Sequence, residues 1–208
     1  MQSLIAALLE GDKAQALAET RRLRAAGVAP ERIVTDGLAE AMRRLDDKCT
    51  VEAFNLLEIM LVGRAVSLVV NELYPEGEVP ATGKATFVIA ALEGDIHDLG
   101  KRIVKMVLTG RGYRVIDCGK DCPVETLVGA AQREGARAVL VSGLITSVIP
   151  QVRTIRAALE RAGLAGVKVV AGGAALKQAT AAELNVDYVA ETAFDGARYL
   201  EQLAEEER

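Results

Sequence analysis

The first 80 residues carry apolar positions at helical spacing throughout. Leu4, Ala7 and Leu8 begin a short apolar face, which Gly11 and Asp12 end. Residues three and four positions apart lie on one side of a helix, so this pattern predicts amphipathic helices that pack against one another. Four helices are expected: a short one around Leu4–Leu8, then Lys13–Ala25, a third from Pro30 through Leu45, and a fourth over Val51–Leu73.

Several residues are suited to begin or end these helices. Asp12 can cap Lys13–Ala25, and Gly27 can end that helix. Pro30 fits the first position of the third helix, and Thr50 can cap the fourth. The fourth helix is apolar on more than one face. We therefore expect it to be buried centrally in a four-helix bundle.

A segment rich in proline and glycine follows the predicted helices. Residues 74–83 hold two prolines and two glycines, a composition that interrupts both helices and strands. The sequence pattern also changes from all-helical to mixed at this point. We therefore predict a domain boundary here, with a helical domain over residues 1–80 and a second domain over residues 81–208.

From Lys84 onward, short apolar runs alternate with amphipathic helical segments. Short apolar runs are typical of buried parallel strands, and strict alternation with helices favours a doubly wound sheet. The chain is therefore predicted to be α/β, with a helical cap before a Rossmann-like (flavodoxin-like) parallel sheet of about five strands. The expected strands are 86–92, 113–117, 137–141, 167–171 and 187–189, and the expected helices are 99–109, 124–134, 148–162, 175–184 and 193–205.

Composition excludes several classes of function. The net charge is −4, and the chain has four Tyr, three Phe and no Trp, so neither phosphate neutralisation nor base stacking supports nucleic-acid binding. No apolar run approaches the roughly 18 residues that span a bilayer. Three cysteines and a start without secretory features lead us to expect a cytoplasmic protein. The single histidine, His97, excludes zinc sites built from several histidines.

Ligands of doubly wound sheets bind beyond the carboxyl ends of the strands, so residues that follow strands are the first candidates. After the first predicted strand, Asp95 and Asp98 flank His97. Asp95 is close enough in a tight loop to accept a hydrogen bond from one ring nitrogen, which leaves the other nitrogen as a ligand. The loop alone is equally consistent with a histidine whose hydrogen bonds are satisfied by helix-capping carboxylates.

Two further clusters follow the third and fourth predicted strands. Residues 142–147 form a partly polar stretch, which could line a ligand or could cap the next helix through Thr146 or Ser147. Gly172 and Gly173 permit close approach of another group to the backbone, although paired glycines alone indicate only a turn.

The spacing of the three clusters resembles that of cobalamin-binding proteins with a helical cap and a Rossmann-like domain. Asp95-x-His97-x-x-Gly100 is followed by 41 residues, and Ser142-x-Leu144 by 27 residues before the Gly-Gly pair. The family pattern has the same three motifs separated by gaps of these lengths. The chain is most similar to corrinoid proteins of anaerobic methyltransferase systems and to the matching module of cobalamin-dependent methionine synthase.

This resemblance implies a role for each motif residue. His97 would coordinate cobalt in place of the cofactor's own base, the base-off, His-on mode, and Asp95 would hydrogen-bond His97. Gly100 would let the loop turn beside the corrin tail, with Ile96 and Asp98 also among the cofactor-binding residues. The tail would enter a channel along the sheet, and Phe54, Leu57 and Leu61 of the cap would lie near the upper corrin face. The residues implied to line or leave room for that channel are Ser142, Leu144, Thr146, Gly172 and Gly173.

The resemblance also has departures. Some relatives carry a hydroxyl six residues after the motif serine, where this chain has Val148, so a proton relay beyond Asp95 is not expected. The long cap helix has Ala65-Val66 where relatives often have Ala-Met. Cys118 and Cys122 could serve a metal or redox role, but no further ligands lie nearby in the sequence, which favours ordinary packing and loop positions.

The function implied is that of a corrinoid protein that carries a methyl group on cobalt between methyltransferase subunits. It would be a carrier component and not a complete enzyme, with a reductive activase as a further partner and with neither nucleic acid nor membrane. Three alternatives stay open: a cobalamin-binding sensor, the small subunit of a cobalamin-dependent mutase, and a metal-free flavodoxin-like domain.

Overall fold

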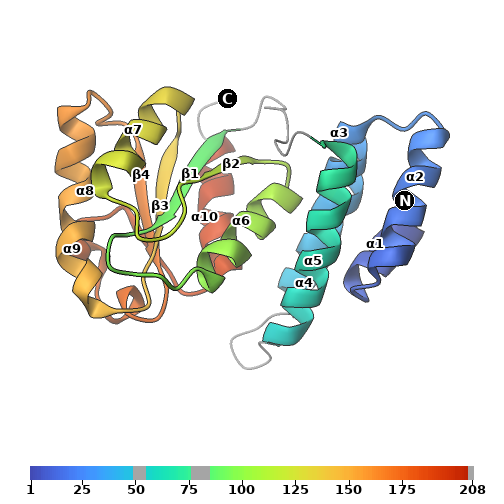
Figure 1. Cartoon of the computed structure of the whole chain (residues 1–208), viewed down its shortest axis with the longest axis horizontal. Coiled ribbons are helices and arrows are strands. Elements are labelled where there is room, and N and C mark those ends of the chain that lie inside the picture. The colour runs from blue at the N-terminus through green and yellow to red at the C-terminus, as the bar shows by residue number, and fades with distance from the viewer. Residues whose placement is uncertain (49–54, 76–84, 206–208) are drawn as a thin grey trace. The chain divides into compact units, whose positions relative to one another are not determined.

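The computed structural model describes residues 1–48, 55–75 and 85–205. By its internal contacts the chain forms two compact units (Figure 1). One is a helical unit, Met1–Gly83 with Met106–Arg114, and the other is an α/β unit, Lys84–Lys105 with Val115–Arg208. The predicted domain boundary after residue 80 lies outside the described residues and stays a prediction.

The helical unit begins with two amphipathic helices whose apolar faces are fully buried, as Leu4 and Leu8 illustrate. Asp12 caps the second helix as predicted, because its Oδ1 accepts a 3.0 Å hydrogen bond from the backbone N–H of Gln15. Pro30 begins the third helix as expected. The elements of this unit are α1 (Gln2–Leu9), α2 (Lys13–Ala25), α3 (Pro30–Ile33), the π-helical η1 (Val34–Leu38), α4 (Ala39–Lys48) and α5 (Leu56–Leu73).

Two of the predicted helices differ from the structure. The single helix expected from Pro30 contains the π-helical turn η1, a change of winding that leaves the apolar periodicity unchanged and so has no sequence signal. The fourth helix, α5, begins at Leu56 and not at Val51. Its cap is Asn55, whose backbone is extended and whose Oδ1 accepts from the N–H of Glu58 at 3.2 Å. Thr50 lies outside the described residues.

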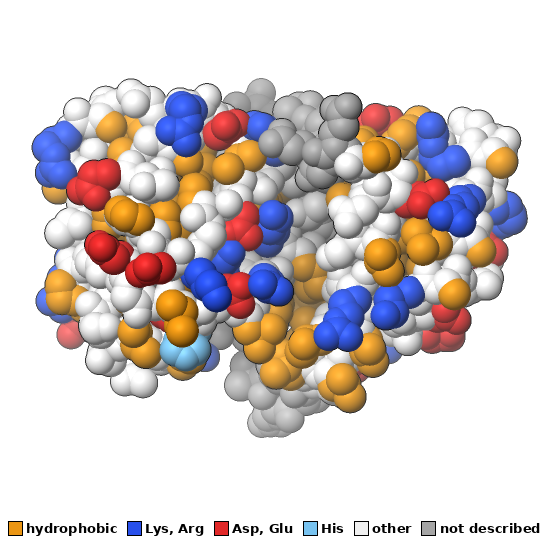
Figure 2. All heavy atoms as spheres, viewed as in Figure 1, with side chains coloured by type: hydrophobic (Ala, Val, Ile, Leu, Met, Phe, Trp, Pro, Cys, Tyr) orange, Lys and Arg blue, Asp and Glu red, His pale blue; other side chains and the backbone are white. Residues whose placement is uncertain are grey.

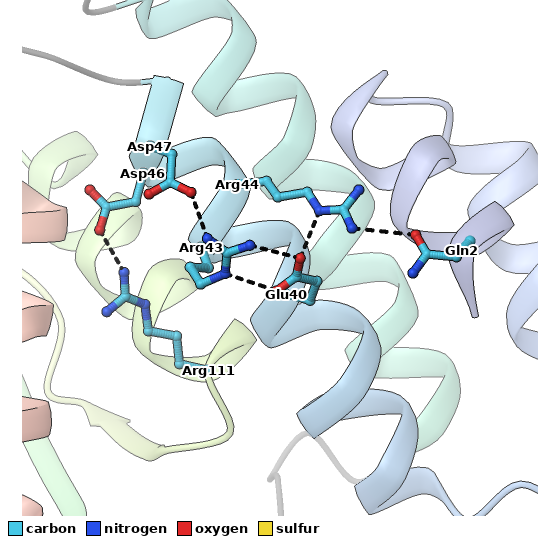
Figure 3. A network of polar contacts seen from close by, with 7 residues as sticks. All are labelled: Gln2, Glu40, Arg43, Arg44, Asp46, Asp47 and Arg111. Carbon is cyan, nitrogen blue, oxygen red and sulfur yellow. Dashed lines mark hydrogen bonds and ion pairs between the residues drawn. The ribbon is translucent and has the colours of Figure 1, made fainter.

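Charged side chains on α4 form a surface network (Figure 3). Nε and Nη2 of Arg43 donate to Glu40, at 2.9 Å each, and Arg44 donates to the same carboxylate at 2.7 Å. These hydrogen bonds lower the pKa of Glu40 to about 2. Arg43 also reaches Asp47, and Arg44 reaches Gln2 of α1. The network therefore ties the exposed side of α4 to its neighbour.

The α/β unit contains a five-stranded sheet with the order β2-β1-β3-β4-β5, the order of flavodoxin-like folds. The pairs β1–β3, β3–β4 and β4–β5 are parallel. Helices α7, α8 and α9 cover one face, and α6 and α10 lie on the other (Figure 1). The predicted fold class is confirmed. The elements are β1 (Thr86–Ala91), α6 (Leu99–Gly110), β2 (Arg114–Asp117), α7 (Val124–Glu134), β3 (Ala138–Ser142), the 3-10 turn η2 (Thr146–Val148), α8 (Ile149–Arg161), β4 (Lys168–Gly172), the 3-10 turn η3 (Leu176–Gln178), α9 (Ala181–Leu184), β5 (Tyr188–Ala190) and α10 (Ala193–Glu205).

The helix predicted over residues 175–184 is divided into η3 and α9. Ala179 adopts an extended backbone between them. Thr180 then starts α9 through a capping box, in which its side chain and that of Glu183 satisfy each other's backbone N–H groups. The local capping preference of these two residues therefore interrupts the longer helical pattern.

The strand register brings the carboxyl ends of the central strands together. Ala91 at the end of β1 is opposite Ser142 at the end of β3. Ser142 is in turn opposite Gly172 of β4, and Gly172 is opposite Ala190 of β5. The loops that carry the three sequence motifs therefore leave the sheet at the same edge.

Candidate functional site

The loop between β1 and α6 presents the only histidine of the chain. Gly94 turns the backbone with a φ of +87°, a left-handed conformation that favours glycine. The N–H of Asp95 then donates to the carbonyl of Leu92 at 2.9 Å. This turn points Asp95 inward, where it is fully buried, and leaves His97 with half of its side chain exposed (51%).

Asp95 holds His97 through both the backbone and the ring. Its Oδ1 accepts from the backbone N–H of His97 at 2.9 Å and lies 2.8 Å from the ring Nδ1. An ionised carboxylate can only accept hydrogen bonds, so this contact requires the hydrogen of a neutral ring to sit on Nδ1. The lone pair is then on Nε2, which has no hydrogen-bond partner among the described residues. The arrangement matches the one in which a carboxylate orients a metal-binding histidine.

The second oxygen of Asp95 is used by the loop that follows β3. Oδ2 accepts from the backbone N–H of Leu144 at 2.7 Å, which joins two motif loops 49 residues apart. Burial on its own would raise the pKa of Asp95. The hydrogen bonds from the N–H groups of Leu144 and His97, and from the His97 ring, outweigh that effect and lower the pKa. The carboxylate is therefore kept ionised beside the imidazole.

The N–H of Leu144 is a contribution that sequence reasoning missed. The motif predicts that Leu144 lines the channel for the cofactor's tail, whereas the structure shows its backbone bound to Asp95. Val148, at the position where the sequence resemblance drew attention to a hydroxyl, is buried and apolar. The described contacts of Asp95 thus end at backbone groups and the ring of His97.

The glycines of the motifs allow close packing where the three loops meet. A Cβ on Gly100 would lie 3.1 Å from the Ser142 hydroxyl oxygen. The N–H of Gly143 donates to the carbonyl of Gly172 at 2.9 Å. Gly173 has a φ of +102°, and a Cβ there would lie 2.5 Å from the Gly143 carbonyl oxygen. Gly100, Ser142, Gly172 and Gly173 are therefore brought together at the carboxyl edge of the sheet.

Apolar side chains surround the exposed imidazole. Ile96, Leu99 and Leu144 expose 63%, 44% and 48% of their surface, although large apolar side chains are usually buried. Figure 2 shows His97, in pale blue, on the surface with hydrophobic side chains next to it. An accessible imidazole nitrogen next to apolar side chains is suited to bind a flat, largely apolar cofactor through a single nitrogen–metal bond.

The remaining predicted residues lie apart from this hydrogen-bonded centre. Asp98 pairs with Arg102 one turn along α6, at 2.8 Å, and no described hydrogen bond joins its side chain to His97. Thr146 is exposed at the start of η2. Leu57 and Leu61 belong to the helical unit, where they lie one turn apart on the exposed side of α5. Phe54 lies outside the described residues.

Cys118 and Cys122 show no sign of a metal site. Both are free thiols. Burial raises the pKa of both, that of Cys118 to about 11, so the unreactive thiol forms dominate. In the described part of the chain, no group of three or more His, Cys, Asp or Glu could hold a metal ion. The two cysteines are therefore best explained by packing and loop structure.

The fold and the site define a flavodoxin-like binding protein that presents one oriented, half-exposed histidine at the carboxyl edge of its sheet. Comparison with known proteins gives the family. Residues 85–199 match the model of a B12 binding domain, and residues 1–74 match a second model with the same description. The chain belongs to the B12-binding family, and the predicted resemblance and corrinoid cofactor are confirmed.

Its relatives include corrinoid proteins of methylamine metabolism. It is 34% identical over 182 residues to monomethylamine corrinoid protein 1 of Methanosarcina mazei, covering 83% of each chain. It is 30% identical to dimethylamine corrinoid protein 1 of Methanosarcina acetivorans, covering 98% of this chain and 96% of the relative. Among solved structures, the methanol:cobalamin methyltransferase complex MtaBC of Methanosarcina barkeri matches with a TM-score of 0.80 and 25% identity, covering 97% of this chain and 78% of that chain.

Among the described residues, no helix is both long and apolar enough to cross a bilayer.

Proposed function

We propose that this chain is a corrinoid protein that carries a methyl group between methyltransferase subunits. B12-binding models match both halves of the chain, and relatives named as corrinoid proteins align with nearly all of it. Relatives named for monomethylamine, dimethylamine and trimethylamine match at similar identities of 34%, 30% and 30%. The proposal therefore concerns the carrier step and not a particular methyl donor.

One observation carries the proposal: buried Asp95 fixes His97 with Nε2 directed away from its partner and half of the ring exposed. His97 would hold the corrinoid cobalt in place of the cofactor's own base, the base-off, His-on mode. Neutral imidazole suits a first-row transition metal, and the Nδ1 contact to Asp95 supplies the tautomer that ligation needs. When bound, the corrinoid supplies a cobalt centre that binds and releases the methyl group.

Other residues at the same edge would hold the rest of the cofactor. Ile96, Asp98 and Leu144 would contact the corrin or its side chains next to His97. The channel for the displaced nucleotide would be bordered by the loops after β3 and β4, through Ser142, Thr146, Gly172 and Gly173. The apolar cap residues Phe54, Leu57 and Leu61 would exclude water from the upper face.

The proposed partners follow from this role. A carrier must meet one methyltransferase subunit that donates the methyl group and another that accepts it. A reductive activase would restore carriers inactivated by oxidation. The likeness to the solved methanol:cobalamin methyltransferase complex MtaBC supports the first kind of partner. Action in the cytoplasm, without nucleic acid or membrane, is part of the proposal.

Cobalamin ligation can be tested by titrating the apo protein with methylcobalamin and recording visible spectra. The wild type should give a histidine-ligated spectrum, and His97→Ala should give a base-off spectrum with no axial nitrogen. Identical base-on spectra for the two proteins would contradict the assignment of His97.

The carrier role needs a separate experiment, because a cobalamin sensor could pass the first. Protein loaded with methylcobalamin is mixed with a thiol and a methylcorrinoid:thiol methyltransferase. A carrier should lose its methyl group to the thiol at a rate that depends on enzyme concentration. Loss no faster than that from free methylcobalamin at the same concentration would favour the sensor.

A further inference from the structure

The loop between β2 and α7 contains a residue with an unusual backbone. Asp121 has a φ of +54° and is one of two non-glycine residues with positive φ in the described part of the chain; the other is Asn185. A left-handed backbone is unfavourable for most L-residues, although Asp and Asn tolerate it better. Such positions persist where surrounding contacts fix them, so the contacts of Asp121 show what this conformation provides.

Asp121 binds two consecutive residues of the histidine loop. Its Oδ1 accepts from the backbone N–H of Gly94 at 2.7 Å. Its own N–H donates to the backbone carbonyl of Asp95 at 3.1 Å. The side chain and the backbone of one residue thus hold the turn that sets the direction of Asp95. A more extended backbone at Asp121 would separate these two hydrogen bonds.

The loop around Asp121 is itself anchored to β1. The backbone N–H of Cys118 donates to the carbonyl of Ile89, and the backbone N–H of Cys122 donates to the carbonyl of Ala91. Glu93 donates back to the carbonyl of Cys122 at 3.0 Å. The loop therefore extends the sheet pairing beyond the end of β1, with Asp121 between its two anchored ends.

A buried ion pair secures the start of the same loop. Asp117, at the end of β2, accepts from the N–H of Gly119 at 2.9 Å and pairs with the ammonium of Lys101, which is only 3% exposed. Lys101 lies in the first turn of α6, directly after the motif glycine Gly100. The β2–α7 loop is thus tied both to the strand before the histidine loop and to the helix after it.

We propose that Asp121 is a positioning residue for His97. Asp121 fixes Gly94 and the backbone of Asp95, Asp95 fixes the ring of His97, and no described contact joins Asp121 to His97 directly. The inference rests on the proposed function, because it concerns how firmly His97 is held for cobalt. It extends the support of His97 beyond Asp95, by a residue 26 positions later in the chain.

The variants separate the carboxylate from the backbone conformation. Asp121→Gly keeps the left-handed turn and removes the acceptor, whereas Asp121→Asn keeps an oxygen acceptor and a residue that tolerates positive φ. Asn185→Ala is the matched control, because Asn185 has a similar φ of +56° at the end of α9 and its side chain binds Arg153. This control disturbs a left-handed residue without touching the histidine loop.

The first readouts use cobalamin-free protein. Amide exchange at Gly94 should be about tenfold faster in Asp121→Gly than in the wild type, because a hydrogen bond to a charged acceptor is lost. The ring nitrogens of His97, which NMR sees alone because the chain has one histidine, should shift toward a mixture of tautomers. Asp121→Asn should restore both values, and Asn185→Ala should leave both unchanged.

The last readout is titration with methylcobalamin. Asp121→Gly should bind about tenfold more weakly and show a smaller histidine-ligated fraction, the lower end of the loss typical for partners of metal-binding histidines. Wild-type Gly94 exchange and wild-type ligation in Asp121→Gly would overturn the inference. If His97→Ala has the wild-type spectrum, the proposed function fails instead, while the cobalamin-free readouts still decide the role of Asp121.

Discussion

Replacing Asp95 by asparagine tests the buried carboxylate that organises the site. The two oxygens of Asp95 accept three hydrogen bonds, from the backbone N–H and ring Nδ1 of His97 and from the N–H of Leu144, at 2.7 to 2.9 Å. An asparagine has only one oxygen. In either orientation, its NH₂ group must therefore face an N–H donor or the ring nitrogen of His97.

The cost can be worked from those contacts. With the oxygen toward His97, the variant keeps two hydrogen bonds, loses the one to Leu144 and leaves that buried N–H without an acceptor. A hydrogen bond to a charged group contributes about 1.5–3 kcal/mol, and an unsatisfied buried donor costs about 1–3 kcal/mol. Avoiding the burial of a charge offsets part of this loss. We expect Asp95→Asn to lower the free energy of unfolding by about 2 kcal/mol.

Urea unfolding at pH 7, followed by circular dichroism, measures this change. Asp98→Asn is the matched control, since Asp98 lies in the same loop but pairs with the exposed Arg102. Its loss should stay under about 0.5 kcal/mol, as for other surface ion pairs. Nitrogen NMR of His97 should also show more of the tautomer with hydrogen on Nε2 in Asp95→Asn. Equal stability of the wild type and Asp95→Asn, with an unchanged tautomer, would refute the reasoning.

Three further substitutions test other parts of the structure. Gly173→Ala should lower the free energy of unfolding by about 2 kcal/mol or more, because its φ of +102° and a backbone oxygen 2.5 Å from the new Cβ both oppose a side chain. The control Gly27→Ala, at φ +80° with open space around it, should lower it by about 1 kcal/mol. Equal losses in urea unfolding would contradict the steric contribution at Gly173. Burial would raise the pKa of Asp187, but hydrogen bonds from Val169 and Arg156 lower it, so the ionised Asp187 should stabilise the fold above its unfolded pKa of about 3.9. The difference in the free energy of unfolding between wild type and Asp187→Asn should therefore shrink as the pH falls from about 5 through the lower folded pKa. A difference that does not change with pH would contradict this prediction. Tyr74→Phe should raise the melting temperature, since the buried hydroxyl has no hydrogen-bond partner among the described residues, and a fall would mean that the hydroxyl is satisfied.

Much of the architecture followed from local sequence patterns. The alternation of apolar runs and helices predicted the α/β class, and α7 and α10 have the bounds expected for them. Asp12 and Pro30 marked helix starts because capping acts within one turn. The start of α5 was placed too early, because an apolar pattern does not show which of two capping residues, Thr50 or Asn55, begins the helix.

The sequence motifs pointed to side chains that the structure brings to one edge of the sheet, but not to the backbone contacts there. The spacing of motifs located Asp95, His97 and Gly173, because strands of a parallel sheet end at one edge. The hydrogen bonds that Leu144 donates to Asp95 and Gly94 donates to Asp121 use backbone N–H groups, which every residue but proline has and which leave no trace in the sequence. Their partners are also 49 and 27 residues apart, so only the folded chain brings them together.

The central claim is that His97, and not the cofactor's own base, binds the cobalt. Protein labelled with ¹⁵N only at histidine carries the label at one residue, so the electron paramagnetic resonance spectrum of bound cob(II)alamin tests this directly. The nitrogen splitting should change from the triplet of ¹⁴N in unlabelled protein to the doublet of ¹⁵N in labelled protein. A triplet that persists in the labelled protein would show that the axial nitrogen belongs to the cofactor and would contradict the account.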